Sequence, residues 1–131
     1  MNTKATLILA MLGSAGIGAL GMAALHAQQP AARKRPAFYI SEFEVTDPES
    51  IKPYSERVES TFAPFSGRYI VRGGNPISLE GEAARGRFVM IGFDSVEQAQ
   101  AWYNSSAYAE IRPIRHNSAK SRAMILEGIA N

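Results

Sequence analysis

The chain has 131 residues, with 14 Lys and Arg, 12 Asp and Glu, two histidines and no cysteine. The lack of cysteine excludes disulfides, thiolate metal sites and cysteine nucleophiles, and two histidines are too few for a histidine metal cluster. Four cations precede residue 37 and every acid follows it, so the rest of the chain has no cationic excess and nucleic-acid binding is not expected.

Residues 1–27 predict a signal peptide or an N-terminal anchor. One lysine precedes an uncharged run over residues 5–25, and the small residues Ala23 and Ala27 offer cleavage sites. The run is long enough to span a bilayer, and the cations at 33–35 oppose translocation, so an uncleaved anchor is the alternative. We expect the rest of the chain in the periplasm or another extracytoplasmic space, unless that cationic cluster inverts the anchor. The membrane is expected as a partner only through an uncleaved N-terminal segment.

After a flexible linker over residues 28–36, the folded domain is expected to span residues 37–131. Runs of β-branched and aromatic residues predict four strands, over residues 37–46, 68–72, 87–93 and 123–129. The third run is apolar on successive residues, which predicts a strand covered on both faces.

Two amphipathic helices are predicted between these strands. The first has apolar residues at spacings of three and four from Ile51 to Phe65. Asp47-Pro48 offers a start, but the later Pro53 implies either a separate first turn or a helix that begins there. The second starts at a capping box, Ser95-Val96-Glu97-Gln98, and is expected to break and restart near Ser105.

The order βαββαβ predicts an α+β fold of the ferredoxin-like kind, with a four-stranded antiparallel sheet and two helices on one face. The other face would then be bare. We expect a second copy of the chain to cover it, and a monomer with a solvated face is the alternative.

Short motifs in the domain resemble the domain-of-unknown-function family 1330. The resemblance is carried by Tyr69-Ile70-Val71-Arg72-Gly73-Gly74, Leu79-Glu80-Gly81, Trp102-Tyr103, Tyr108 and Glu127-Gly128. It implies a ferredoxin-like fold related to the dimeric α/β barrels, in which two sheets close into a barrel, and it supports the homodimer. The family brings no established reaction, so it implies architecture and not mechanism.

Arg72, Arg112 and Arg115 are the first candidates for a ligand site. Their planar guanidinium groups could converge on a carboxylate or phosphate, and the alternative is structural pairing with Glu80, Glu110 or Glu127. Glu80 is a further candidate, either to orient Arg72 or to cap a turn.

Two aromatic residues complete the candidate set. Tyr108 follows the expected helix break and could direct its phenol into a cleft, whereas Trp102 is also explained by core packing. In some dimeric α/β barrels a helix histidine binds haem iron, but His116 is interpreted as a solvated helix end. No cofactor and no metal are expected.

These observations predict a small exported dimer that binds a small polar or anionic molecule between sheet and helices. Whether it is an enzyme stays open, and any catalysis is expected to be cofactor-free oxygenase or isomerase chemistry. The alternative is a non-catalytic dimeric interaction module whose arginines are structural.

Overall fold

The structure is a computed structural model that describes residues 32–130, so the predicted leader over residues 1–27 lies outside the described residues. In chain order its elements are β1 (Ala37–Val45), α2 (Lys52–Phe62), the short 3-10 helix η1 (Ala63–Phe65), β2 (Arg68–Gly74), β3 (Arg87–Phe93), α3 (Val96–Tyr103), α4 (Ser106–Ser118) and β4 (Ala119–Glu127). Within residues 32–130, no helix is both long and apolar enough to cross a bilayer.

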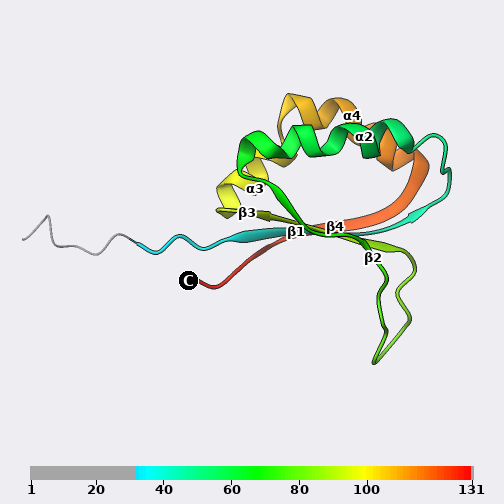
Figure 1. The fold of residues 1–131 in the computed structure, drawn as a ribbon, viewed down its shortest axis with the longest axis horizontal. Coiled ribbons are helices and arrows are strands. Elements are labelled where there is room, and N and C mark those ends of the chain that lie inside the picture. The colour runs from blue at the N-terminus through cyan, green and yellow to red at the C-terminus, as the bar shows by residue number, and fades with distance from the viewer. Residues whose placement is uncertain (1–31, 131) are drawn as a thin grey trace, which may run out of the picture. The chain divides into compact units, whose positions relative to one another are not determined.

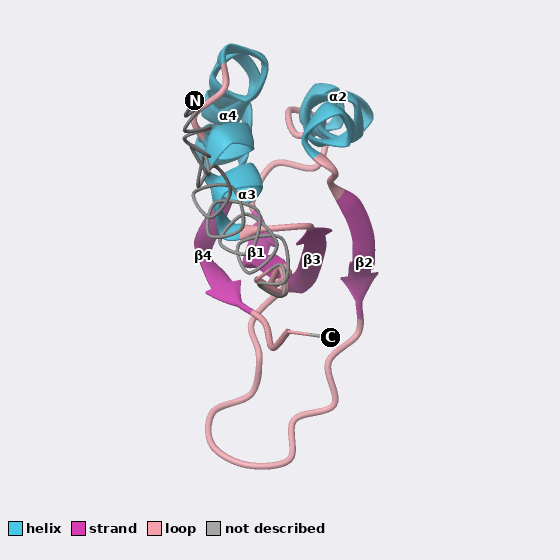
Figure 2. Ribbon diagram, turned by 90° about the vertical axis from the view of Figure 1, so that its left-hand side faces the viewer, coloured by secondary structure: helices cyan, strands magenta, loops and turns pink. Residues whose placement is uncertain are grey.

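The four strands form one antiparallel sheet in the order β2-β3-β1-β4 (Figure 1). Strand β1 is central and pairs along its length with both β3 and β4. Figure 2 shows all the helices over one face of the sheet, with α2 on the β2 side and α3 and α4 on the β4 side. The predicted α+β ferredoxin-like fold is therefore confirmed.

The turn before α2 settles where the first helix begins. Asp47 caps a short turn, since its Oδ1 accepts the backbone N–H groups of Glu49 at 3.2 Å and Ser50 at 3.0 Å. The helix proper starts at Lys52, with Pro53 in its first turn, where a missing N–H breaks no helical hydrogen bond. The first turn is thus a separate piece.

The second helical segment divides at Ser105, as predicted. Ser95 Oγ caps α3 by accepting the backbone N–H of Gln98 at 3.2 Å. Ser105 Oγ caps α4 in the same way, accepting the N–H of Tyr108 at 3.3 Å. The restart sets the helical register of α4, which decides which of its arginines face inward.

The last strand starts four residues earlier than predicted. Residues 119–122 are mostly polar, but they pair with β1 from Val45 back to Glu42, and the strand ends at Glu127. Pairing along a long central neighbour extended this strand where its own side chains gave no apolar signal.

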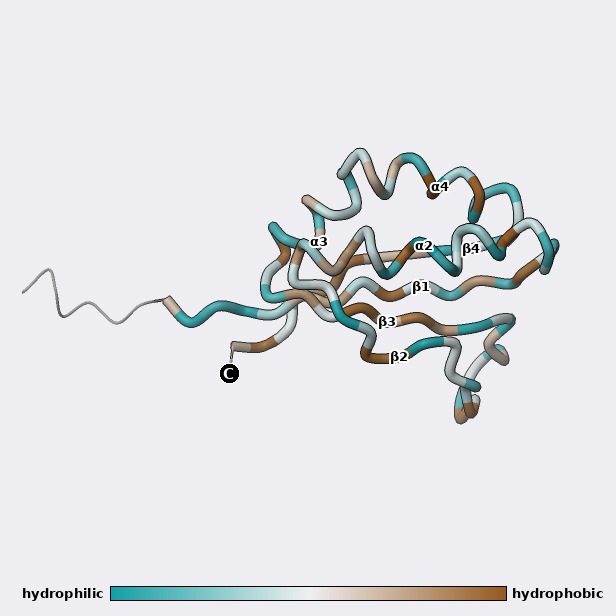
Figure 3. Tube along the Cα trace, turned by 45° about the horizontal axis from the view of Figure 1, so that its top comes forward, coloured by the Kyte–Doolittle hydropathy of each residue, from teal (hydrophilic) through white to brown (hydrophobic). Residues whose placement is uncertain are grey.

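The sheet face away from the helices, called here the open face, carries a row of apolar side chains across its middle. Ile40 of β1 lies between Met90 of β3 and Met124 of β4. Met124 and Leu126 are 47% and 48% exposed. The loop over residues 75–86 projects on the same side, and its tip is hydrophobic (Figures 1 and 3).

Candidate functional site

A cavity of about 350 Å³ lies between the helix-covered face of the sheet and α2. We call it the sheet–helix cavity. Its lining comes from three strands, α2 and one residue of α4, and consists of Tyr39, Ser41, Phe43, Tyr54, Ser55, Val58, Tyr69, Arg72, Gly73, Arg87, Val89, Ile91 and Arg115. The volume is at the low end of the range of about 300–1,000 Å³ that is typical of small-molecule sites.

The lining is cationic. It contains Arg72, Arg87 and Arg115, and among the described residues no aspartate or glutamate lines it. Arg72 and Arg87 are exposed at the mouth, whereas Arg115 is only 2% exposed. The positive charge is therefore both at the entrance and in the interior.

Arg115 is a buried cation whose observed partners are all neutral. One terminal nitrogen, Nη1, donates to Ser121 Oγ at 3.2 Å and to Ser41 Oγ at 3.5 Å. The other, Nη2, lies 3.3 Å from His116 Nε2, and Nε has no hydrogen-bond partner in the described chain. Within residues 32–130 no acid forms an ion pair with it. The predicted alternative of a structural glutamate partner is not found for this arginine.

Three buried phenols surround this guanidinium. The Tyr54 and Tyr108 hydroxyls lie 3.2 Å apart, and the Tyr39 hydroxyl, near Ser41 and Tyr108, makes no hydrogen bond of good geometry in the described chain. Burial raises the pKa of Tyr54 to about 12 and raises the pKa values of Tyr39 and Tyr108 as well. At neutral pH all three are protonated, and of the three Tyr39 and Tyr54 line the sheet–helix cavity.

Arg72 reaches the cavity because β2 contains a bulge. Tyr69 is opposite Ile91, but Val71 is opposite Met90 and Arg72 is opposite Val89, so one residue is added between Tyr69 and Val71. In a regular strand Arg72 would point to the opposite face from Tyr69, and the extra residue turns it to the same face.

The ion pair of Arg72 is weak. Its Nη1 is 3.8 Å from Glu59 Oε2, with both side chains more than 60% exposed, and such pairs contribute about 1 kcal/mol or less. Its guanidinium also lies 4.8 Å from the centre of the Tyr69 ring. This leaves Arg72 available at the mouth of the cavity.

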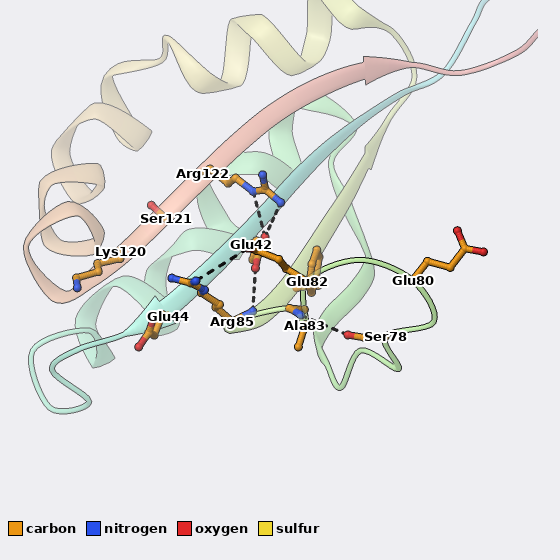
Figure 4. A pocket seen from close by; sticks show the side chains of 12 residues that line it. Glu42, Glu44, Ser78, Glu80, Glu82, Ala83, Arg85, Lys120, Ser121 and Arg122 are labelled. Carbon is orange, nitrogen blue, oxygen red and sulfur yellow. Dashed lines mark hydrogen bonds and ion pairs between the residues drawn. The ribbon is translucent and has the colours of Figure 1, made fainter.

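Glu80 does not join this site. It is exposed in the loop between β2 and β3 and lines a different depression of about 560 Å³ (Figure 4). The expected contact between Glu80 and Arg72 is therefore absent from the described structure. In that depression Glu42 accepts the Arg85 backbone N–H and the Arg122 side chain, both at 3.0 Å. The Arg85 hydrogen bond holds the pKa of Glu42 below its ordinary value.

The other three candidates lie outside the sheet–helix cavity. Arg112 packs 4.9 Å over the Tyr103 ring and donates to the Tyr103 carbonyl at 3.2 Å. Trp102 is fully buried in the core, where its Nε1 donates to Thr61 Oγ1 at 3.0 Å. Tyr108 is also fully buried, and its phenol contacts Tyr54 rather than a cleft. Of the six candidates, only Arg72 and Arg115 share the site.

Sequence reasoning missed Tyr39, Ser41 and Arg87. A signal for Ser41 existed, because it is a small polar residue between Tyr39 and Phe43 on the inward-facing side of an otherwise apolar strand. His116 is exposed, as predicted, and the partial desolvation of its ring together with the charges of Arg115 and Arg112 lowers its pKa. Over residues 32–130, no group of three or more metal-binding side chains is arranged to hold a metal ion.

A ferredoxin-like sheet with a cavity under its helices places the protein in an α+β class similar to the dimeric α/β barrel proteins. The chain belongs to the family described as Domain of unknown function (DUF1330), which matches residues 36–129. No curated protein sequence matches it.

Two solved structures illustrate the likeness. The RPA0582 protein of unknown function from Rhodopseudomonas palustris has 17% identity and a TM-score of 0.60, covering 86% of this chain and 94% of its own. SnoaB, a cofactor-independent oxygenase from Streptomyces nogalater, has 13% identity and a TM-score of 0.52, covering 75% of this chain and 96% of its own. At these identities the likeness establishes the fold alone.

Proposed function

We propose that the protein is an exported homodimer that binds a small anionic molecule in the sheet–helix cavity. The observation that carries the proposal is Arg115, a guanidinium 2% exposed with only neutral partners among the described residues. A buried charge is costly unless it is paired, and a bound anion would supply the missing opposite charge.

The cavity suits binding better than general acid–base chemistry. Among the described residues its lining has no carboxylate and no histidine, and burial keeps its tyrosines Tyr39 and Tyr54 protonated at neutral pH. It therefore lacks a group that would remove a proton from a substrate near pH 7. Cofactor-free oxygenase chemistry is supported only by the fold shared with SnoaB, and isomerase chemistry has no such support.

A second copy of the chain is the proposed cover of the open face. The apolar row of Ile40, Met90 and Met124 lies in the middle of this face, with Ile70 50% exposed beside it. Contiguous exposed apolar patches of this kind mark interaction sites. The alternative function, a non-catalytic interaction module, rests on this surface alone and leaves the unpaired Arg115 without an explanation.

Export rests on residues 1–27, outside the described structure. If the leader is cleaved, sequencing of the mature N-terminus from the native host will give Gln28 or Ala24. An intact Met1 in the membrane fraction would instead establish the anchor and remove cleavage from the proposal.

The anion site is tested by thermal melts of the full-length chain with and without millimolar phosphate, citrate or benzoate. Binding to the folded state raises the melting temperature with ligand concentration, and Arg115→Met, which keeps most of the alkyl volume and removes the buried charge, is expected to abolish that response. Arg112→Met is the matched control, because Arg112 lies over Tyr103 outside the cavity. A wild-type melting temperature that no anion changes would refute the site and favour the interaction module.

A further inference from the structure

The inner end of the sheet–helix cavity, formed by Tyr39, Ser41 and Arg115, has hydrogen-bond donors but no anionic acceptor among the described residues. Tyr39, Ser41 and Arg115 are each 2% exposed and line the cavity. Arg115 Nε and the Tyr39 hydroxyl make no hydrogen bond of good geometry in the described chain, and both atoms have almost no accessible surface. A guanidinium has no acceptor atom, and the protonated phenol has a free O–H, so a two-oxygen anion fits this end.

The walls between this end and the mouth are apolar. Phe43, Val58, Val89 and Ile91 contribute aliphatic and aromatic carbon, and the side chains of Tyr54 and Tyr69 contribute ring surface. An inorganic anion held by Arg115 would leave these walls in contact with water. A ligand with an apolar body would cover them, and burial of apolar surface favours that ligand.

The mouth and the volume limit what the rest of the ligand can be. The exposed Arg72 and Arg87 attract anions toward the entrance, but solvated cations there add little affinity. A cavity of about 350 Å³ is small for a drug-sized molecule, which excludes an extended multi-ring body.

Building on the anion site argued above, we infer that the ligand is a monocarboxylate with a compact apolar body about the size of one ring. Its carboxylate binds at the inner end beside Arg115, Ser41 and Tyr39, and small side-chain shifts open Arg115 Nε and the Tyr39 hydroxyl to it, because both atoms have almost no accessible surface in the unliganded structure. Its body lies between Val58 of α2 and Val89 of β3.

Isothermal titration of the full-length chain with four probes tests this assignment. Benzoate has both the charge and the ring, acetate and phosphate have the charge alone, and benzyl alcohol has the ring alone. We expect benzoate to bind at least about tenfold more tightly than acetate, because the ring removes apolar wall from water. Benzyl alcohol is expected to bind more weakly than benzoate, because it leaves Arg115 unpaired.

Tyr39→Phe separates binding from folding. The Tyr39 hydroxyl lies near Ser41 and Tyr108 but makes no hydrogen bond of good geometry with either, so its removal is expected to leave the melting temperature close to that of wild type. Benzoate affinity is expected to fall roughly tenfold or more, as for losing a hydrogen bond to a charged group. Arg112→Met is the control and is expected to bind benzoate as wild type does.

The outcomes distinguish this inference from the proposed function. Acetate or phosphate binding as tightly as benzoate would overturn the apolar body and leave the anion site standing. Benzoate affinity unchanged in Tyr39→Phe would overturn the inner-end assignment. If no anion binds, or if benzyl alcohol binds as well as benzoate, both the inference and the proposed function are overturned.

Discussion

Replacing Arg115 with methionine separates a ligand-binding arginine from a structural one. Methionine keeps most of the alkyl volume and removes the charge. The variant loses hydrogen bonds to Ser121 at 3.2 Å, to Ser41 at 3.5 Å and to His116 at 3.3 Å. It also removes a cation that is 2% exposed and that no acid neutralises within residues 32–130.

These two effects on the free energy of unfolding oppose each other. Hydrogen bonds from a charged donor contribute about 1.5–3 kcal/mol at good geometry, and bonds of 3.2–3.5 Å are long, so their combined loss is about 2–3 kcal/mol. Desolvation of an unpaired ion costs several kcal/mol, and the variant recovers it. The net change for Arg115→Met is expected to be within about 1 kcal/mol of zero.

Urea denaturation of the full-length chain, without added anions, measures this change. The chain has one tryptophan, Trp102, whose fluorescence reports unfolding from the middle of the core. Arg112→Met on the same helix is the matched control for loss of an arginine. A structural arginine with a buried acidic partner would instead cost about 3–5 kcal/mol when removed. If Arg115→Met lowers the free energy of unfolding by that amount with an unchanged m-value, Arg115 is a structural residue and its ligand-binding role is refuted.

Three further predictions concern the core, the open face and pH. Thr61→Val leaves the buried Trp102 N–H without its 3.0 Å acceptor and is expected to lower the free energy of unfolding, measured in urea, by about 1–3 kcal/mol. Ser60→Ala, at the exposed neighbouring residue, is expected to change it little. Equal losses in the two variants would contradict the buried hydrogen bond. Met124→Lys places a charge in the apolar row and is expected to shift sedimentation from dimer to monomer, and an unchanged mass would show that this face is not the interface. The pKa of Tyr54 is raised from 10.0 to about 12 in the folded state, so this phenol ionises first in the unfolded state. The contribution of the neutral Tyr54 phenol to the free energy of unfolding is therefore complete below about pH 10 and is lost as pH rises toward 12. Thermal melts should show a decline over that range that is smaller in Tyr54→Phe, and an identical decline in both proteins would contradict it.

Most of the fold was predictable because local chemistry and long-range packing agree. The third strand, over residues 87–93, and the caps at Ser95 and Ser105 lie where the sequence places them. The start of the last strand was predicted four residues too late. Residues 119–122 become a strand through pairing with β1, and a local sequence pattern does not show a pairing partner.

The site was less predictable because orientation depends on three-dimensional details. Arg115 and Arg112 are three residues apart on α4, yet only Arg115 points into the cavity, and the restart at Ser105 sets that choice. Glu80 was expected near Arg72 from its neighbouring motif, but it belongs to a loop that projects away from the helices (Figure 1). Tyr39 and Ser41 were hidden in a strand that the sequence showed mainly as apolar.

The extra residue in β2 determines how insertions and deletions would affect the charge of the cavity. Because Ile70 and Val71 together oppose Met90, loss of Ile70 would leave a regular strand in which Arg72 still follows Val71 and still faces inward. An insertion of one residue between Val71 and Arg72, without a new bulge, would turn the arginine to the open face. Relatives that lack residue 70 can therefore keep the same cation at the same entrance, and an alignment that counts residues forward from Tyr69 without a gap would assign it to the wrong face.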